Sequence, residues 1–219
     1  MPNYRRAWHA GGTYFFTVNL LQRRNNNLLV RHIALLRHVV ATVQSRHPFK
    51  IHGWVVLPEH LHCVIELPLN DMDFALRWRS IKTNFSKGLP KTERRSKVRV
   101  ARGERGIWQR RYWEHLVWDD ADMQAHMDYV HFNPVRHGLV RRLANWPFST
   151  FHALVKQGVY ASDWGGVDDA LLPYDDWHAA QCASLIGALR VAGYARCLAC
   201  RSDGFLSITA LRTGASVDV

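Results

Sequence analysis

The chain has 219 residues, a length that allows one ordinary domain with an appendage. A hydrophobic share of 47% excludes a disordered chain, and no apolar run approaches the length of a membrane span. Lys and Arg outnumber Asp and Glu by 29 to 18, which gives a formal net charge of +11. We therefore expect a nucleic acid as the partner, and cytoplasmic residence because residues 1–8 lack the apolar core of a signal peptide.

The first half of the chain predicts three strands and two helices. Residues 11–20 are aromatic and β-branched after a glycine pair, which favours a central strand. Apolar residues at helical spacing predict an amphipathic helix over 31–45. Strands over 51–57 and 60–67 flank a Pro-Glu turn and should form a hairpin, and 73–89 should form the second helix.

The second half predicts a basic loop, one strand and one further helix. Residues 91–106 are polar and nearly free of acids, which is typical of a mobile loop without regular structure. A strand over 112–118 follows, and then a helix that Asp119 or Asp120 caps and Pro134 ends. The fold class is α+β: a ferredoxin-like, antiparallel four-stranded sheet with helices on one face, plus this extra helix.

The strand over 60–67 carries the first candidate site. Residues two apart share a face of a strand, so His60 and His62 project together while Cys63 belongs to the opposite, core face. Two imidazoles side by side are half of a metal site. On spacing alone, two histidines on a half-exposed strand without a metal are the preferred interpretation, and a metal site needs a third ligand and a nucleophile from elsewhere.

The extra helix carries a second pair. Tyr129 and Asn133 are four residues apart and share a helical face, so the phenol and the amide can point together. The alternative is a core tyrosine with a helix-ending asparagine. The basic composition and the His-x-His pair weigh against that alternative.

Several segments resemble one known family. His60-Leu61-His62 resembles the HUH motif (histidine, bulky apolar residue, histidine) of single-strand DNA nucleases. Residues 129–140, Tyr-Val-His-Phe-Asn-Pro-Val-Arg-His-Gly-Leu-Val, resemble the tyrosine segment of the REP-associated tyrosine transposases. Residues 4–8, 11–17 and 146–149 resemble other segments of the same family, and the resemblance spans 1–166. It implies a catalytic domain over 1–166 and leaves 167–219 as a tail of unknown role.

The resemblance implies a catalytic tyrosine, Tyr129, and a divalent metal held by His60, His62 and Asn133. Two imidazoles and an amide favour Mg²⁺ or Mn²⁺, because zinc more usually recruits a carboxylate or a thiol. The implied substrates are hairpin-forming repeats of bacterial chromosomes, which would associate the protein with the nucleoid. Cleavage would leave a covalent 5′-phosphotyrosine. The protein itself is expected to act as a monomer or as a homodimer.

Basic and aromatic side chains are the candidate DNA contacts. Cations that could neutralise phosphates are Arg5, Arg6, Arg23, Arg24, Arg77, Arg79, Lys82, Arg110 and Arg111. Aromatic side chains that could stack on unpaired bases are Trp78, Trp108, Tyr112 and Trp113. For each of them a solvated charged face or a core aromatic is the alternative, and for most of them, taken singly, the sequence favours that alternative.

Two other functions compete with the enzyme. One is a hairpin-DNA-binding protein that does not use its catalytic residues, and the other is an RNA-binding module on the same scaffold. In the tail, Cys197 and Cys200 have the spacing of half a zinc site, with Cys182 and His178 as conceivable partners. The second half lacks the usual ligand spacing, so the sequence argues against structural zinc.

Overall fold

The structure of the protein is a computed structural model that describes residues 8–165. Its centre is a four-stranded antiparallel sheet formed by β1 (Thr13–Asn19), β2 (Lys50–Val56), β3 (His60–Glu66) and β4 (Trp113–Leu116). The strand order is β2-β3-β1-β4, with β1 and β3 in the middle. The predicted hairpin, the central position of the first strand and the ferredoxin-like order are confirmed.

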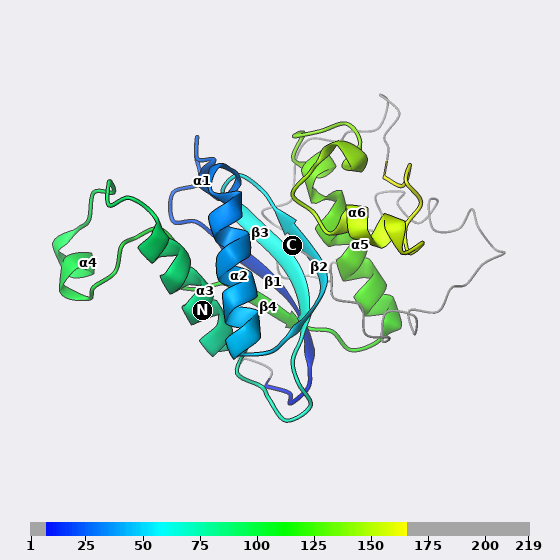
Figure 1. Cartoon of the computed structure of the whole chain (residues 1–219), viewed down its shortest axis with the longest axis horizontal. Helices are drawn as coiled ribbons and strands as arrows, with labels where there is room; N and C mark the ends of the chain where they lie inside the picture. Colours follow the sequence, from blue (N-terminus) through cyan, green and yellow to red (C-terminus); the bar gives the residue numbers. More distant parts are fainter. Residues whose placement is uncertain (1–7, 166–219) are drawn as a thin grey trace, which may run out of the picture.

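Two helices cover one face of the sheet (Figure 1). α2 (Ile33–Arg46) follows the single turn α1 (Leu28–Arg31) and buries Leu36, Val39, Val40 and Val43, a spacing that makes one continuous helical stripe. α3 (Phe74–Gly88) begins at Asp73, whose carboxylate accepts a hydrogen bond from the Leu76 N–H. These helices pack on the face that Cys63 occupies, as the alternation in β3 predicts.

α5 (Asp120–Arg136) covers the opposite face (Figure 1). It lies so close to β2 that a Cβ atom on Gly53 would stand 2.6 Å from the Met127 sulfur. The short 3₁₀ helix η1 (Leu143–Asn145) and α6 (Phe151–Lys156) complete this second core. The sheet is therefore buried on both sides, and the strand predicted to be half-exposed is covered.

α5 corrects one predicted boundary. The helix does not end at Pro134 but continues to Arg136. Proline lacks the N–H that would donate to the carbonyl one turn earlier, yet Val130 and Val135 on both sides of it are buried in the second core. The packing of this helical face outweighs the local preference of the proline.

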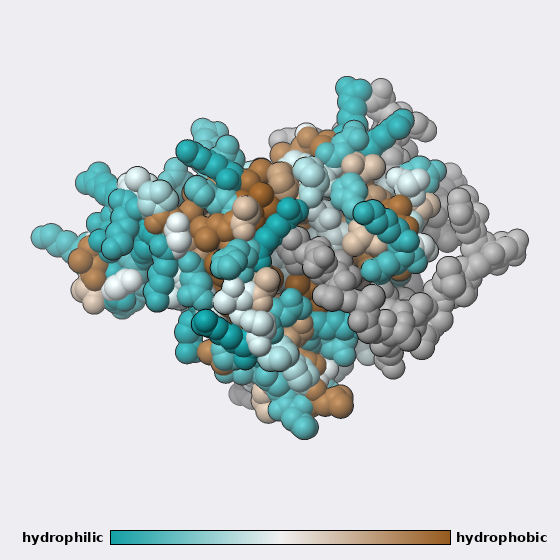
Figure 2. Space-filling model, viewed as in Figure 1, coloured by the Kyte–Doolittle hydropathy of each residue, from teal (hydrophilic) through white to brown (hydrophobic). Residues whose placement is uncertain are grey.

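Residues 91–106 correct a second expectation. They form an extension that leaves the body of the protein and carries a short helix, α4 (Lys97–Ala101), rather than a loop without regular structure (Figure 1). Arg105 fixes its base: the guanidinium pairs with Glu93 at 2.6 Å and donates to the carbonyl oxygens of Ser86, Leu89 and Pro90. The surface of the extension is mostly hydrophilic (Figure 2).

No helix within residues 8–165 is long and apolar enough to cross a bilayer.

Candidate active site

The site lies between the sheet and α5. His60 and His62 project from β3 toward this helix, and each side chain is 3% exposed. Their rings are 4.8 Å apart, edge to face. The shared face that the sequence predicts for the two imidazoles is therefore confirmed, but the face is buried rather than half-exposed.

Glu59 orients His60. The Nδ1 atom of His60 lies 3.0 Å from a carboxylate oxygen of Glu59, which also pairs with Arg23 at 3.4 Å. Burial alone would raise the pKa of Glu59, but the hydrogen bond from His60 and the nearby charges outweigh it and lower the pKa. The ionised carboxylate accepts the Nδ1 proton, which leaves the lone pair of His60 on Nε2.

Thr17 from the neighbouring strand β1 holds His62. Its hydroxyl lies 2.9 Å from Nδ1, and Thr17 is the register partner of His62 in the sheet. The other nitrogen, Nε2, is buried and has no hydrogen-bond partner. Burial, followed by the charge of neighbouring His60, lowers the pKa of His62 well below its ordinary value. The imidazole is neutral at neutral pH, and when Nδ1 donates its proton to the Thr17 hydroxyl, the lone pair is on the unpartnered Nε2 atom.

Tyr129 projects from α5 onto the same cluster. Its ring centroid is 5.1 Å from that of His62 and 5.6 Å from that of Phe15, both edge to face. The guanidinium of Arg136, two turns later on α5, lies 5.8 Å from the centre of the phenol ring. The structure thus brings the predicted nucleophile and one predicted metal ligand together.

Asn133 is fully buried one turn after Tyr129. Its amide nitrogen donates a 2.6 Å hydrogen bond to the Tyr129 carbonyl oxygen. The amide oxygen, Oδ1, is buried without a hydrogen-bond partner. Such an atom costs free energy unless something binds it, and a cation is one such partner.

His137 is a residue that the sequence reasoning missed. It caps the C-terminal end of α5, and its ring centroid is 5.1 Å from that of His60. Its position depends on the continuation of α5 past Pro134, so a helix predicted to end there gave no signal for it. Thr17 was missed for a similar reason, because only strand pairing brings it to His62.

A second group of ligand-type side chains lies on the same face of the sheet. His115 on β4 and Asp122 and His126 on α5 each offer a ligand atom, and these atoms all lie within 4.8 Å of one another. Within residues 8–165, these three residues form a group that could hold a metal ion. None of them was among the predicted ligands, because their approach depends on the packing of α5 on β4.

Two of the predicted DNA contacts form bonds within the protein. Arg77 is 1% exposed; its guanidinium pairs with Asp71 at 2.7 Å and donates to the backbone oxygens of Pro48 and Asp73. The amine of Lys82 donates to the Gln109 and Arg110 oxygens, and burial lowers its pKa to about 8. Both side chains hold loops onto α3; Arg77 is buried, whereas Lys82 is half-buried.

The remaining predicted cations differ in their surroundings. Arg24, Arg79 and Arg111 are exposed, whereas Arg110 pairs with Glu104 at 3.0 Å and Arg23 with Glu59. Arg5 and Arg6 lie outside the described residues, as do His178, Cys182, Cys197 and Cys200 of the tail.

The predicted stacking residues belong largely to the interior. Trp78 and Trp108 are buried in the core beneath α2 and α3, and Tyr112 and Trp113 are half-buried. Trp118, at the end of β4, is 73% exposed and was not predicted. It is the better candidate for contact with an unpaired base.

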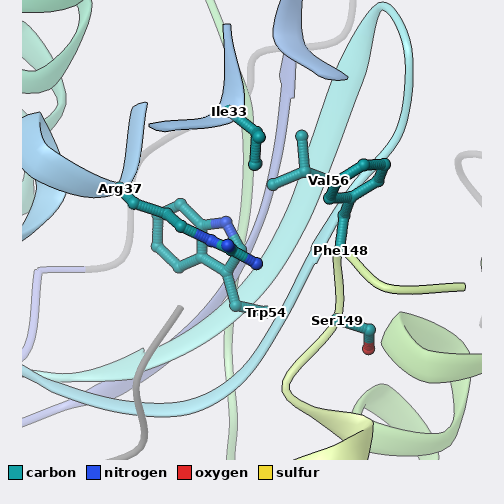
Figure 3. A pocket seen from close by; sticks show the side chains of 6 residues that line it. All are labelled: Ile33, Arg37, Trp54, Val56, Phe148 and Ser149. Atoms are coloured by element: carbon teal, nitrogen blue, oxygen red, sulfur yellow. The ribbon is translucent and has the colours of Figure 1, made fainter. Parts of the chain in front are cut away.

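A hollow elsewhere on the surface lies away from the histidines. It is shallow, about 160 Å³ and open to solvent, and is lined by Ile33, Arg37, Trp54, Val56, Phe148 and Ser149 (Figure 3). Trp54 and Val56 alternate along β2 with Val55, the register partner of His62. The hollow is thus on the opposite face of the sheet from His62.

Comparison with known proteins identifies the family. No family model matches the chain. The chain is 46% identical over 166 residues to a REP-associated tyrosine transposase of Escherichia coli (strain K12), an alignment that covers 76% of this chain and 92% of that protein. This chain belongs to the REP-associated tyrosine transposase family.

Two further members of this family agree. A Haemophilus influenzae relative that carries the same family name is 43% identical over 176 residues, 80% of this chain and 99% of the relative. A solved REP-associated tyrosine transposase bound to a REP hairpin is 42% identical, with a TM-score of 0.65 over 81% of this chain and 100% of that one. The predicted family and the predicted α+β fold are confirmed.

Proposed function

We propose that this protein is a metal-dependent single-strand DNA endonuclease and strand transferase that acts on hairpin-forming repetitive DNA through Tyr129. The observation that carries the proposal is the contact of the Tyr129 ring with the ring of His62, whose Nε2 atom is buried without a hydrogen-bond partner. One turn after Tyr129 on the same helix, Asn133 Oδ1 is buried without a hydrogen-bond partner as well. The family name and the REP hairpin bound by the solved relative support DNA as the substrate. The activity is assigned to residues 1–166, and no role to 167–219.

His60, His62 and Asn133 would hold one divalent cation, Mg²⁺ or Mn²⁺. His60 is oriented by Glu59 and His62 by Thr17, so each imidazole directs Nε2 away from its hydrogen-bonded side. Two imidazoles and an amide oxygen would leave coordination positions open. The ion would act as a Lewis acid for the negative charge of the scissile phosphate.

Tyr129 performs the bond exchange. Its phenol oxygen attacks the phosphorus, the new O–P bond forms as the bond to the 3′ oxygen breaks, and the phenol proton is given up as the leaving oxygen is protonated. The 5′-phosphate stays on Tyr129 as an ester and a 3′-hydroxyl is released. A second 3′-hydroxyl can reverse the exchange without ATP, because the ester conserves the bond energy.

Arg136 is placed to assist this step. Its guanidinium lies 5.8 Å from the centre of the phenol ring, so its positive charge favours the phenolate that forms when Tyr129 loses its proton. The same cation can meet a phosphate that approaches Tyr129. His137 and Arg23 add further cationic or polar groups on the His60 side of the cluster.

The test is a covalent adduct. Labelled single-stranded REP hairpin DNA, incubated with the protein and Mn²⁺ and run on a denaturing gel, should give a protein–DNA band. Tyr129→Phe should lose both the band and the cleavage while hairpin binding persists. Tyr112→Phe is the matched control, because Tyr112 packs in the other core, and should cleave normally.

Two outcomes favour the competing functions. Tight hairpin binding by the parent protein without any cleavage would favour a DNA-binding protein. Preference for RNA would favour the RNA module, which needs aromatic side chains exposed on the central strands. Here Phe15 on β1 is 1% exposed beneath α5, which weakens that alternative.

A further inference from the structure

The group of His115, Asp122 and His126 is separate from the site around His62. Phe15 stands between the two: its ring centroid is 4.8 Å from that of His126 and 5.7 Å from that of His62. A phenyl ring in this position prevents ions on its two sides from sharing a bridging ligand. Any ion bound by the second group would therefore be an independent one, and not part of a two-metal centre.

Two elements of the fold meet in this group. Asp122 and His126 are one turn apart on α5 and face β4, where His115 is the register partner of Phe15. Oδ2 of Asp122 lies 2.8 Å from His115 Nε2, and Oδ1 lies 2.9 Å from His126 Nδ1. The carboxylate thus lies between the two imidazoles, and it also accepts the Trp118 N–H at 3.0 Å.

Two polar atoms of the group have no hydrogen bond. His126 Nδ1 is 2.8 Å from the Asp122 backbone oxygen, to which it donates its proton, so the lone pair is on Nε2. That Nε2 atom is buried and unpartnered, and Asp122 Oδ1 makes no well-aligned hydrogen bond despite its proximity to His126. The side chains of His126 and Asp122 are 2% and 6% exposed, so bulk solvent hardly reaches either atom.

The donor set differs from that of the first site. Two imidazoles and one carboxylate suit Zn²⁺, which binds three protein ligands and keeps a position open for water. His115 is 30% exposed, which offers an entry path for an ion and a solvent-facing coordination position. The carboxylate adds the negative charge that the group of His60, His62 and Asn133 lacks.

We propose that His115, Asp122 and His126 form a second metal site, which takes an ion of the zinc class and joins β4 to the first half of α5. The ion fixes the helix three residues before Tyr129, so its role is to position the nucleophile. The rings of His115 and His126 are stacked, 4.6 Å apart and 18° from parallel. An imidazole nitrogen binds an ion that lies in the plane of its ring, and two stacked rings cannot both do so for the same ion. The more exposed His115 therefore turns when the ion binds.

Metal titration of the full-length chain tests the site. Zn²⁺ binding is measured by equilibrium dialysis in the parent protein, in His115→Gln and in His38→Gln, a control that removes an exposed histidine of α2. We expect His115→Gln to bind one Zn²⁺ fewer per chain than the parent protein and His38→Gln to bind the same number. Equal Zn²⁺ binding by the parent and His115→Gln would contradict the proposed metal site. The three residues would then be a hydrogen-bonded His-Asp-His network without a metal.

Cobalt distinguishes this site from the cysteines of the tail. Co²⁺ at a nitrogen and oxygen site absorbs in the visible range, whereas thiolate ligands add an intense near-ultraviolet band. His115→Gln and Asp122→Asn should each lose the share of the visible absorption that belongs to one nitrogen and oxygen site, and keep any thiolate band. Loss of the thiolate band alone would overturn the proposal. Mn²⁺-dependent DNA cleavage is measured in parallel, so a failure of the proposed nuclease would be seen separately from a failure of this site.

Discussion

At the scale of single residues, the partners of the two histidines are as informative as the histidines themselves. A ring nitrogen is available for a cation only if the other nitrogen carries the proton, and a neighbouring side chain usually decides this. Glu59 performs this role for His60, because its carboxylate only accepts, and the Thr17 hydroxyl is placed to accept the Nδ1 proton of His62. Glu59 is next to its histidine in the chain, whereas Thr17 is 45 residues away.

Thr17→Val tests the orientation of His62. The substitution keeps the branched shape and removes the hydroxyl that bonds Nδ1, so the ring loses its orientation and Mn²⁺ affinity should fall by about 10-fold to 100-fold. Titration calorimetry with Mn²⁺ measures the effect. Thr42→Val is the control, since this hydroxyl bonds a backbone oxygen within α2. Equal Mn²⁺ affinity in the two variants would contradict the proposed role of Thr17.

Arg77→Met tests the structural role of a predicted DNA contact. It leaves Asp71 and the Pro48 carbonyl without their partner, so we expect a loss of about 2–4 kcal/mol in the free energy of unfolding. Affinity for hairpin DNA should stay within about 2-fold, a difference of less than 0.5 kcal/mol. Arg79→Met, at an exposed position of the same helix, should leave stability unchanged. Urea unfolding and a binding titration measure both quantities. Weaker DNA binding by the folded Arg77→Met variant would restore the original assignment.

At the scale of elements, the sequence predicts the sheet better than the layers around it. The alternation from His60 to Leu67 identifies β3 and its two faces, because a strand presents successive side chains to opposite sides. It does not show that α5 covers the histidine face, since this depends on contacts with residues more than 60 positions away. The burial of the site and the positions of Thr17 and His137 follow from that one contact.

Helix ends and loops are predicted less well than strands, because their sequence signals report only local preference. Proline and charged runs are signals of irregular structure, but they report only local preference. In α5 the burial of Val130 and Val135 outweighs Pro134, and in the extension the hydrogen bonds of Arg105 hold a basic run in a defined fold.

The extension is the element that offers the most exposed positive charge, and we expect it to bind phosphates. Three exposed cations on it are Arg94, Lys97 and Arg102. Replacing all three by Gln should reduce the slope of log affinity against log salt by about 0.7 for each lost single-strand phosphate contact. The control is a variant that replaces three exposed cations outside it, Arg31, Arg46 and Lys156. Equal slopes in the two triple variants would place the DNA on another surface.

At the scale of the whole molecule, burial gives the fold two opposite dependences on pH. Burial lowers the pKa of His131 to about 3, and it lowers that of His62 as well. Below the ordinary histidine pKa the unfolded chain binds these protons and the folded chain does not, so stability falls as the solution becomes acidic. Asp128 acts in the other direction, because burial raises its pKa to about 6 despite hydrogen bonds from Tyr160 and Gln124.

Asp128→Asn separates these contributions. Between the ordinary Asp pKa and about 6, the folded parent protein binds a proton that the unfolded chain releases, so the parent gains stability from Asp128 as pH falls. Asparagine keeps the hydrogen-bonding oxygen and does not titrate. Relative to the parent, the variant should be more stable at neutral pH, and its advantage should shrink by about 1–2 kcal/mol between ~pH 7.5 and ~pH 5. Urea unfolding with a chelator present, so that no metal binds, measures the difference. A constant difference in the free energy of unfolding across this range would show that Asp128 is ionised in the folded protein as it is in the unfolded chain. The change of stability with pH would then come from the histidines alone.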